Sequence, residues 1–205
     1  TLANIIMNLE KADSGTVLLN NKDITNIKSN KLKEIYKDIQ MVFQDAIGSF
    51  NPRFTIEESI MEYVCNLCST TEADKKHKVD NLLRMVGLSK EYKYRYPHEL
   101  SGGQCQRAAI ARALSAQPKI LVCDEATSAL DVSVQAQIVE LLKEMQEKMN
   151  ISYLFITHDL ALVSSFCDRV AVMKNGKVVE VGDAKEVINN PMDEYTKLLI
   201  KSAYF

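Results

Sequence analysis

The stretch KILVCDEATSALD, residues 119–131, joins a short apolar run to two adjacent carboxylates, Asp124 and Glu125. An uninterrupted apolar run of this length is typical of a strand buried on both faces, as in a parallel sheet covered by helices. Ligands of such sheets bind in the crevice at the carboxyl ends of the strands. We therefore expect a binding site here, where Asp124 can hold Mg²⁺ and Glu125 can take a proton from water. A solvated acidic strand end is the alternative that the two residues leave open by themselves.

Two more apolar runs predict strands of the same sheet: IQMVF at 39–43 and SYLFI at 152–156. An apolar stripe at helical spacing runs from Val134 to Met149, between the second and third strands. A helix in that place is the crossover connection that two neighbouring parallel strands require. Two hairpins are predicted as well, around Asn20-Asn21 and around Asn175-Gly176. The second contains Asn-Gly, which favours a type I′ turn.

The stretch between the first two strands has helical apolar spacing from Ile56 to Val86. It predicts a helical subdomain inserted into the sheet domain. The class is therefore α/β. We expect a core formed by residues 1–44 and 115–205, and a helical subdomain formed by residues 45–114.

Composition narrows the class of protein. The chain has 205 residues and a formal net charge of −2, so it has no overall basic field and we expect no nucleic-acid partner. No apolar run approaches the roughly 20 residues that cross a bilayer. Five cysteines, an odd number without a framework spacing, favour a reducing compartment. Cys65 and Cys68 form a C-x-x-C without a second pair, so zinc or redox chemistry there is only a minor alternative.

The segment LSGGQCQRAAIARAL, residues 100–114, predicts a helix with Ser101 as its N-cap. Gly102 and Gly103 fall in the first turn, although glycine in a helix interior costs about 1 kcal/mol relative to alanine. Unobstructed N–H groups at the positive end of a helix make a site for phosphate. A capped helix with a flexible start is the simpler alternative.

Two polar residues follow the other strands. Gln44 comes after IQMVF, where its amide can reach a metal or water, and His158 comes after SYLFI. A single histidine is more often structural than catalytic. Since both lie at strand ends in parallel order with Asp124 and Glu125, we expect one shared cleft.

The order of Gln44, LSGGQ, ILVCDEATSALD and ITHD resembles the ATP-binding subunit of ABC transporters over nearly the whole chain. The resemblance implies a P-loop NTPase-like (RecA-like) core, with ATP and Mg²⁺ as ligands. It implies that Asp124 and Gln44 serve Mg²⁺, and that Glu125 is the general base for the attacking water. Gln44 would also approach that water, and His158 would contact the γ-phosphate.

The same resemblance implies a dimer that holds ATP at its interface. Ser101, Gly102, Gly103 and Gln104 would bind the γ-phosphate of a nucleotide held by the partner subunit. Asp131 would communicate across the dimer. The partner would be a homologous or identical ABC ATPase subunit.

Two segments narrow the resemblance: FQDAIGSFNPRFTIEESI (43–60) and NPMDEYTKLLI (190–200) resemble importers of oligopeptides, dipeptides and nickel. The resemblance implies that Arg53 and Phe54, in the loop after Gln44, face transmembrane permease subunits. It also implies an extracytoplasmic binding protein as an indirect partner, and a peripheral location on the cytoplasmic face of a bacterial membrane.

Members of this family carry a phosphate loop, G-x-x-G-x-G-K-[ST], before a helix that resembles TLANIIMNLE. We expect Thr1 to follow that loop directly. The chain would then lack its own phosphate-binding loop for ATP and be inactive alone. A soluble, non-transport ABC ATPase and a non-enzymatic fragment that completes a partner's site are the alternatives. The transported substrate and the choice between a homodimer and a heterodimer stay open.

Overall fold

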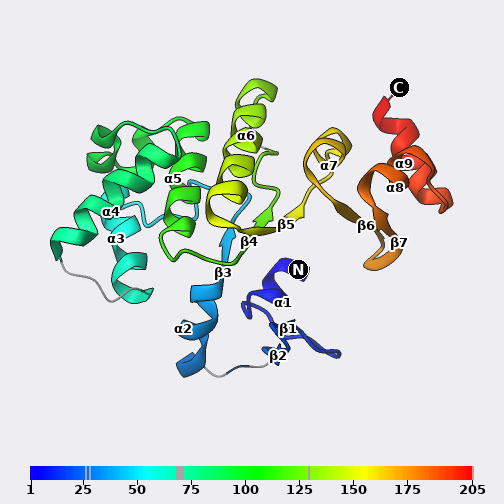
Figure 1. Cartoon of the computed structure of the whole chain (residues 1–205), viewed down its shortest axis with the longest axis horizontal. Coiled ribbons are helices and arrows are strands. Elements are labelled where there is room, and N and C mark those ends of the chain that lie inside the picture. The colour runs from blue at the N-terminus through cyan, green and yellow to red at the C-terminus, as the bar shows by residue number, and fades with distance from the viewer. Residues whose placement is uncertain (26, 28, 68–71, 129, 205) are drawn as a thin grey trace. The chain divides into compact units, whose positions relative to one another are not determined.

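The computed structural model describes the whole chain except residues 26, 28, 68–71, 129 and 205 (Figure 1). The chain divides into two compact units, Thr1–Ile156 and Thr157–Phe205, and each is described by itself. The second unit begins directly after the third predicted strand. The proposed boundaries of the helical subdomain, residues 45 and 114, stay a prediction.

The centre of the first unit is a parallel sheet of β3 (Ile39–Val42), β4 (Ile120–Asp124) and β5 (Ser152–Ile156), in that order. All three strands were predicted, and their parallel pairing confirms the α/β class. The register pairs Asp124 with Ile156, so the carboxyl ends lie at one edge.

One expectation about this sheet is wrong. β5 was predicted to be buried on both faces, but four of its five residues are half-buried and Ser152 is exposed. β3 likewise pairs with β4 alone within the described residues, yet it is buried along its whole length, because α2 (Ser29–Asp38) and α5 (Gly102–Leu114) pack on it. In the described part of the chain no helix packs on β5 to the same extent.

The crossover between β4 and β5 is α6 (Val132–Met149), as predicted. Asp131 caps its start, and Asn150 ends it in a left-handed conformation with φ 53°. Its buried residues follow the predicted apolar stripe: Ile138, Leu141, Leu142 and Met145. Helix periodicity therefore directs one face of α6 onto the sheet.

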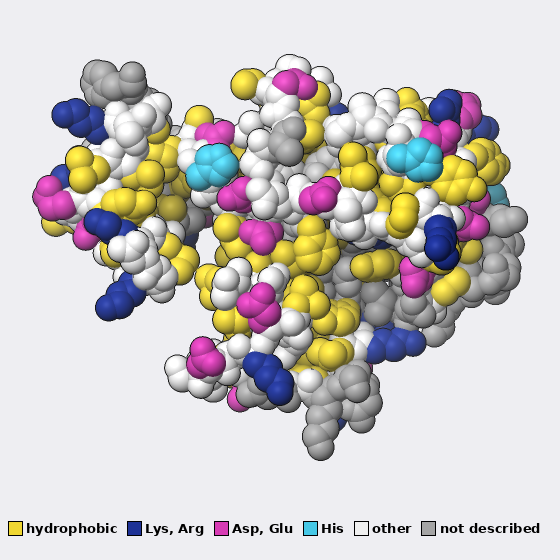
Figure 2. Space-filling model, turned by 180° about the vertical axis from the view of Figure 1, so that it is seen from behind, with side chains coloured by type: hydrophobic (Ala, Val, Ile, Leu, Met, Phe, Trp, Pro, Cys, Tyr) yellow, Lys and Arg dark blue, Asp and Glu magenta, His cyan; other side chains and the backbone are white. Residues whose placement is uncertain are grey.

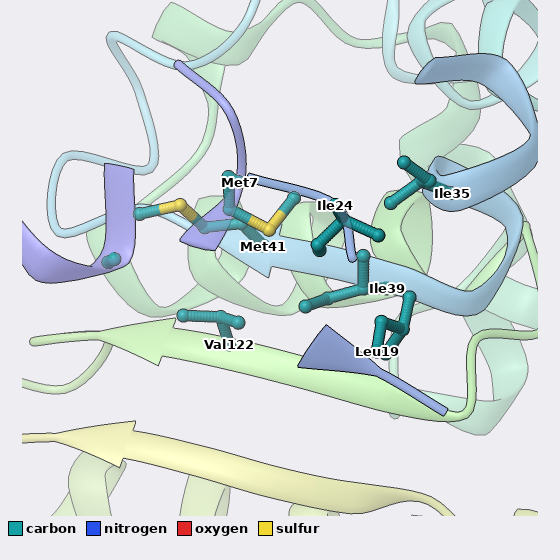
Figure 3. Close-up of a cluster of buried hydrophobic side chains, with 8 residues drawn as sticks. Met7, Leu19, Ile24, Ile35, Ile39, Met41 and Val122 are labelled. Atoms are coloured by element: carbon teal, nitrogen blue, oxygen red, sulfur yellow. The ribbon is translucent and has the colours of Figure 1, made fainter. Parts of the chain in front are cut away.

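The opposite face of the sheet is covered by the start of the chain. This layer consists of α1 (Leu2–Ile6), the hairpin of β1 (Leu18–Leu19) and β2 (Lys22–Asp23), and α2 (Ser29–Asp38). Figure 3 shows their side chains converging on β3 and β4. The labelled members of this apolar cluster are Met7, Leu19, Ile24, Ile35, Ile39, Met41 and Val122. The predicted Asn20-Asn21 turn is confirmed, with φ of 50° and 63°.

The insertion between β3 and β4 is helical, as predicted. It contains α3 (Ile56–Leu67), α4 (Glu72–Met85), the 3₁₀ turns η1 (Lys90–Tyr94) and η2 (Pro97–Glu99), and α5 (Gly102–Leu114). The described apolar residues of its predicted stripe are buried: Ile56, Ile60, Val64, Val79, Leu82, Leu83 and Val86. α5 packs on α3 and α4 and also on β3, so it joins the helices to the sheet.

The second unit contains α7 (Leu160–Phe166), the antiparallel pair β6 (Arg169–Lys174) and β7 (Lys177–Asp183), α8 (Ala184–Asn189) and α9 (Glu194–Tyr204). The predicted hairpin turn is confirmed, because Asn175 and Gly176 have φ of 49° and 76°. Such positive values at both central residues are those of a type I′ turn.

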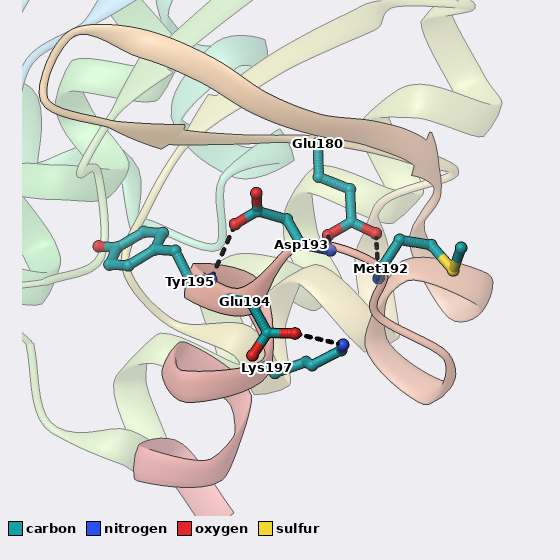
Figure 4. Close-up of polar contacts among 6 residues, drawn as sticks. All are labelled: Glu180, Met192, Asp193, Glu194, Tyr195 and Lys197. Atoms are coloured by element: carbon teal, nitrogen blue, oxygen red, sulfur yellow. Dashed lines mark hydrogen bonds and ion pairs between the residues drawn. The ribbon is translucent and has the colours of Figure 1, made fainter.

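A carboxylate fastens the last helix of this unit to the hairpin (Figure 4). Glu180, on β7, accepts hydrogen bonds from the backbone N–H groups of Met192 and Asp193, at 2.9 and 3.1 Å. The bond from Met192 is the main reason why the pKa of Glu180 lies below its ordinary value. Glu180 thus holds the approach to α9.

The surface carries both signs of charge. On the face drawn in Figure 2, Lys and Arg side chains are interspersed with Asp and Glu side chains. Among the described helices, none combines the length and the apolar character of a membrane-spanning helix.

Candidate functional site

The structure joins two of the predicted site residues at the carboxyl edge of the sheet. Gln44 lies in the loop after β3, and Glu125 directly follows β4. The Gln44 side-chain amide Nε2 donates a hydrogen bond to Glu125 Oε2 at 2.7 Å. Residues far apart in sequence meet here because β3 and β4 are paired in parallel. A carboxylate held in this way can accept a proton from a water molecule beside it.

The backbone of Glu125 is fixed on both sides. Its N–H donates to the carbonyl oxygen of Ile156 at 2.9 Å, and its own carbonyl accepts from Ser128 N–H and Ser128 Oγ at 3.1 and 3.0 Å. Its φ is +46°, a left-handed value that is uncommon outside glycine. Such conformations persist where surrounding bonds enforce them, and they are frequent at active sites.

Asp124 ends β4 as a half-buried carboxylate beside Glu125. Mg²⁺ prefers oxygen ligands, and a carboxylate at a strand end is a typical one. The Nε2 of Gln44 donates its hydrogen bond to Glu125. The other amide atom of Gln44, Oε1, can therefore serve as a second oxygen ligand for the metal ion. The residues present therefore fit Mg²⁺.

His158 belongs to the second unit, which is described by itself. It is exposed and lies between Thr157 and Asp159. The Thr157 hydroxyl accepts from Asp159 N–H at 3.0 Å, and Asp159 caps α7 through two backbone N–H groups. The backbone around His158 is thus a defined turn, and the contact of His158 with phosphate stays a prediction.

The predicted N-cap at Ser101 is confirmed. Ser101 Oγ accepts from Gln104 N–H at 3.3 Å, and Gln104 Oε1 accepts from Ser101 N–H at 3.0 Å, which is a capping box. Gln104 Nε2 also donates to the hydroxyl of Tyr92 at 2.9 Å. The N–H groups of Ser101 and Gln104 are thus used within the capping box, and those of Gly102 and Gly103 remain as the natural anion donors.

The two glycines of this turn differ in their surroundings. A Cβ at Gly103 would lie 2.6 Å from Val134 Cγ1, whereas a Cβ at Gly102 would make ordinary contact with Leu130 at 3.6 Å. Close packing against the start of α6 is thus sufficient reason for glycine at 103. The start of α5 consequently lies against the segment that flanks Asp131.

Asp131 is exposed and caps α6. Its Oδ1 accepts from Ser133 Oγ at 2.6 Å and from Val134 N–H at 3.0 Å. The bond from Ser133 is the main cause of a pKa below the ordinary value. Asp131 has a structural role that the sequence reasoning did not assign, and its role across a dimer stays a prediction.

One of the two predicted permease-facing residues lies at a cavity of about 600 Å³. Phe54 is half-buried and lines this cavity, whereas Arg53 is exposed. Asn51 shapes the turn, because its side-chain and backbone oxygens accept from Arg53 N–H and Phe54 N–H, both at 3.0 Å. Tyr63 and several polar side chains share the lining.

Sequence reasoning missed Arg112, which also lines the cavity and has only 6% of its surface exposed. An arginine within an alanine-rich helix carries no signal of its own in a single sequence. Cys65 is exposed on α3, and Cys68 lies outside the described residues, so the C-x-x-C stays untested.

Residues 1–128 match the family model described as ABC transporter. The oligopeptide transport ATP-binding protein OppF of Salmonella typhimurium is 46% identical over 203 residues, which cover 98% of the chain and 61% of that protein. The dipeptide transport ATP-binding protein DppF of Lactococcus lactis is 46% identical over 189 residues, with 92% and 61% covered. The chain thus spans about three fifths of the length of these relatives.

Solved structures resemble the fold closely. The cbiO1 protein of Clostridium perfringens, described as part of the ABC transporter complex cbiONQ, gives a TM-score of 0.80 at 33% identity, with 92% of the chain and 74% of that structure covered. A dimeric ATP-binding cassette, MJ0796, bound to ADP and phosphate gives 0.79 at 30% identity, with 89% and 79% covered. The predicted P-loop NTPase-like fold is confirmed.

Proposed function

The chain belongs to the ABC transporter family, and on that premise we propose that it is part of the ATP-hydrolysing subunit of a peptide importer. The observation that carries this proposal is the hydrogen bond between Gln44 and Glu125 at the carboxyl edge of the parallel sheet. It unites a residue after β3 with the candidate general base after β4. The peptide class rests on the names of the relatives, which are oligopeptide and dipeptide transport proteins.

In the proposed reaction Glu125 accepts a proton from the water that attacks the γ-phosphate. The Gln44 amide holds the carboxylate of Glu125 and aligns it with that water. Asp124 and the Gln44 amide oxygen would hold Mg²⁺, which would supply charge neutralisation for the phosphate oxygens. His158 contacts the γ-phosphate from the turn before α7.

The segment Ser101–Gln104, here called the signature segment, serves a nucleotide held by a second subunit. Its side chains are bonded within the chain, and its first N–H groups belong to the positive end of a helix of 13 residues. These features suit an anion presented from outside the chain. The MJ0796 cassette, a related protein, is described as a dimer.

Coupling to a permease would use the loop 45–55 and the cavity beside it. Phe54 offers an apolar contact in the cavity wall, and the exposed Arg53 can pair with an acidic residue or a phosphate. A segment of a transmembrane permease is the occupant that we propose. The subunit would then work at the cytoplasmic face of a bacterial membrane, with an extracytoplasmic binding protein as an indirect partner.

The chain of 205 residues should hold Mg-ATP weakly by itself. None of its seven glycines begins a Gly-Lys-Ser or Gly-Lys-Thr sequence, so it contains no phosphate loop of the usual type. Calorimetric titration with Mg-ATP checks this, compared with a full-length subunit that carries such a loop. Equal affinities would contradict it.

The function as a whole is tested with the full-length subunit reconstituted with its permease and binding protein in vesicles. We expect ATP-dependent uptake of a labelled peptide. Phe54→Asp should lower uptake about tenfold or more while the ATPase rate of the isolated subunit changes about twofold at most, because burying an unpaired charge is unfavourable only where the partner covers it. Equal losses in both assays would show that Phe54 is a core residue.

A further inference from the structure

Arg112 is a buried cation near the C-terminal end of α5. Only 6% of its surface is exposed, and burial lowers the pKa of its guanidinium. A charge removed from water needs hydrogen bonds or another compensating contact. The partners of Arg112 therefore indicate what the residue does.

Those partners lie on two other elements. Arg112 Nη1 donates to the backbone carbonyl of Ser49 at 2.7 Å, and Nη2 donates to Ser49 Oγ at 2.8 Å. The guanidinium carbon also lies 4.2 Å from the centre of the Phe50 ring and 5.3 Å from that of Tyr63, on α3. A planar guanidinium with two hydrogen bonds and two aromatic rings in contact has little freedom to move.

Ser49, the residue that Arg112 bonds, belongs to the loop between β3 and α3. Ser49 lies midway between Gln44, which bonds Glu125, and Phe54, which lines the cavity. Arg112 itself lies on α5, and this helix begins directly after Ser101, the first residue of the signature segment. One side chain thus ties the loop 45–55 to the helix that bears the signature segment.

We propose that Arg112 is a positioning residue that transmits displacement of the loop 45–55 to the signature segment through α5. This inference rests on the proposed function, since the permease is what displaces the loop. α5 moves as a rigid body because its helical hydrogen bonds and buried face resist bending. A shift of the loop at Ser49 would therefore be passed on to α5 as long as the contacts of Arg112 hold.

Two variants test the connection from its two ends. Arg112→Lys keeps the charge but replaces the fork by a single ammonium, and Ser49→Ala removes the acceptor Oγ while the backbone carbonyl remains. Arg84→Lys is the matched control, because Arg84 is an exposed arginine of the same helical region. The measured quantity is the ratio of permease-stimulated to basal ATPase rate in the full-length subunit.

We expect Arg112→Lys to lower this ratio about fivefold to tenfold. Ser49→Ala should lower it less, because the bond from Nη1 to the Ser49 carbonyl remains. The double variant should resemble Arg112→Lys alone, because the bond that Ser49→Ala removes is one of those that Arg112→Lys removes. Arg84→Lys should leave it unchanged. If the double variant lowered the ratio by the product of the two single effects, Arg112 and Ser49 would act independently and the inference would be wrong. Basal and stimulated rates that fall together with an intact ratio would show that Arg112 only stabilises the fold.

Hydrogen exchange in the isolated full-length subunit separates this inference from the proposed function. Arg112→Lys should speed exchange at residues 46–54 without a change in β4 or α6. If the wild-type subunit gains no rate on the permease, the proposed function fails while the exchange result still decides whether Arg112 holds the loop. Unchanged exchange at 46–54 would overturn the inference.

Discussion

The carboxyl edge of the sheet and the start of α5 both place polar groups at the end of an element, but they are built differently. At the sheet edge, Gln44 bonds Glu125 across a large sequence separation. At the start of α5, Ser101 and Gln104 bond each other within one helical turn. The first pairing is assembled by the tertiary fold, whereas the second is formed within one helical turn.

This difference is consistent with the different ligand groups that we propose for the two regions. The sheet edge presents a fixed carboxylate and oxygen donors, which are groups that act on water and a metal ion. The start of α5 presents backbone N–H groups, and in the function that we propose these would bind an anion without any acid or base. A dimer in which one subunit supplies the first site and its partner the second uses both kinds of group on one nucleotide.

The largest effect should follow from loss of the general base. Glu125→Gln in the full-length subunit keeps the shape of the side chain but cannot accept the proton, so the turnover rate should fall by about 10²–10⁴-fold. Nucleotide binding should persist, because Glu125 holds no phosphate. Steady-state hydrolysis and equilibrium binding of ATP measure the two effects.

Glu140→Gln is the control for this change, since Glu140 is an exposed glutamate of α6. It should leave turnover within about twofold, as exposed substitutions usually do. Near-normal turnover in Glu125→Gln would contradict the proposal that the sheet edge carries the catalytic base while the start of α5 only binds phosphate.

A smaller effect should separate the two glycines of the signature segment. Gly103→Ala brings a Cβ against Val134, and such overpacking typically destabilises a protein by about 1–3 kcal/mol. Gly102→Ala makes only ordinary contact and should cost less. Thermal unfolding of the two variants gives the comparison. Equal stability would mean that the start of α5 is not packed against α6.

The smallest effect concerns a carboxylate with a purely structural role, in contrast to Glu125. The folded-state pKa of Glu180 is below its ordinary value of 4.5. Its stabilising contribution is therefore present above that value and is lost as the pH falls through the folded-state pKa. Protection of the Met192 and Asp193 amides from hydrogen exchange should decrease there.

Glu180→Gln should show reduced protection of these amides already at neutral pH and little further change in acid. ATP turnover at neutral pH should stay close to normal. Wild-type protection that is independent of pH between 3 and 6, roughly the range in which carboxylates titrate, would contradict the role of the carboxylate.

Much of the fold was predictable because local patterns decide it. Apolar runs indicated all three parallel strands, and the Asn20-Asn21 and Asn175-Gly176 turns are favoured by residues that tolerate positive φ. The N-cap at Ser101 follows from the same kind of local chemistry. The half-buried state of β5 was not predictable, because the burial of a strand at the edge of the sheet depends on which helices pack on it.

The site was predictable only in part. Strand order along the chain indicated that Gln44 and Glu125 share an edge, but not that the amide donates to the carboxylate. The contact of Gly103 with Val134 and the burial of Arg112 arise from packing between elements. No periodicity or spacing encodes such contacts, so they required the structure.

The division of labour between the sheet edge and the start of α5 is tested most directly in dimers assembled from two differently tagged copies of the full-length subunit. Glu125→Gln and Ser101→Arg are placed either in the same copy or in opposite copies, and ATP turnover of the purified dimers is measured. If each nucleotide is held by one copy's sheet edge and the other's signature segment, changes in opposite copies leave one complete site, whereas changes in the same copy damage both. The account predicts clear turnover for opposite copies and almost none for the same copy. The reverse pattern would contradict it.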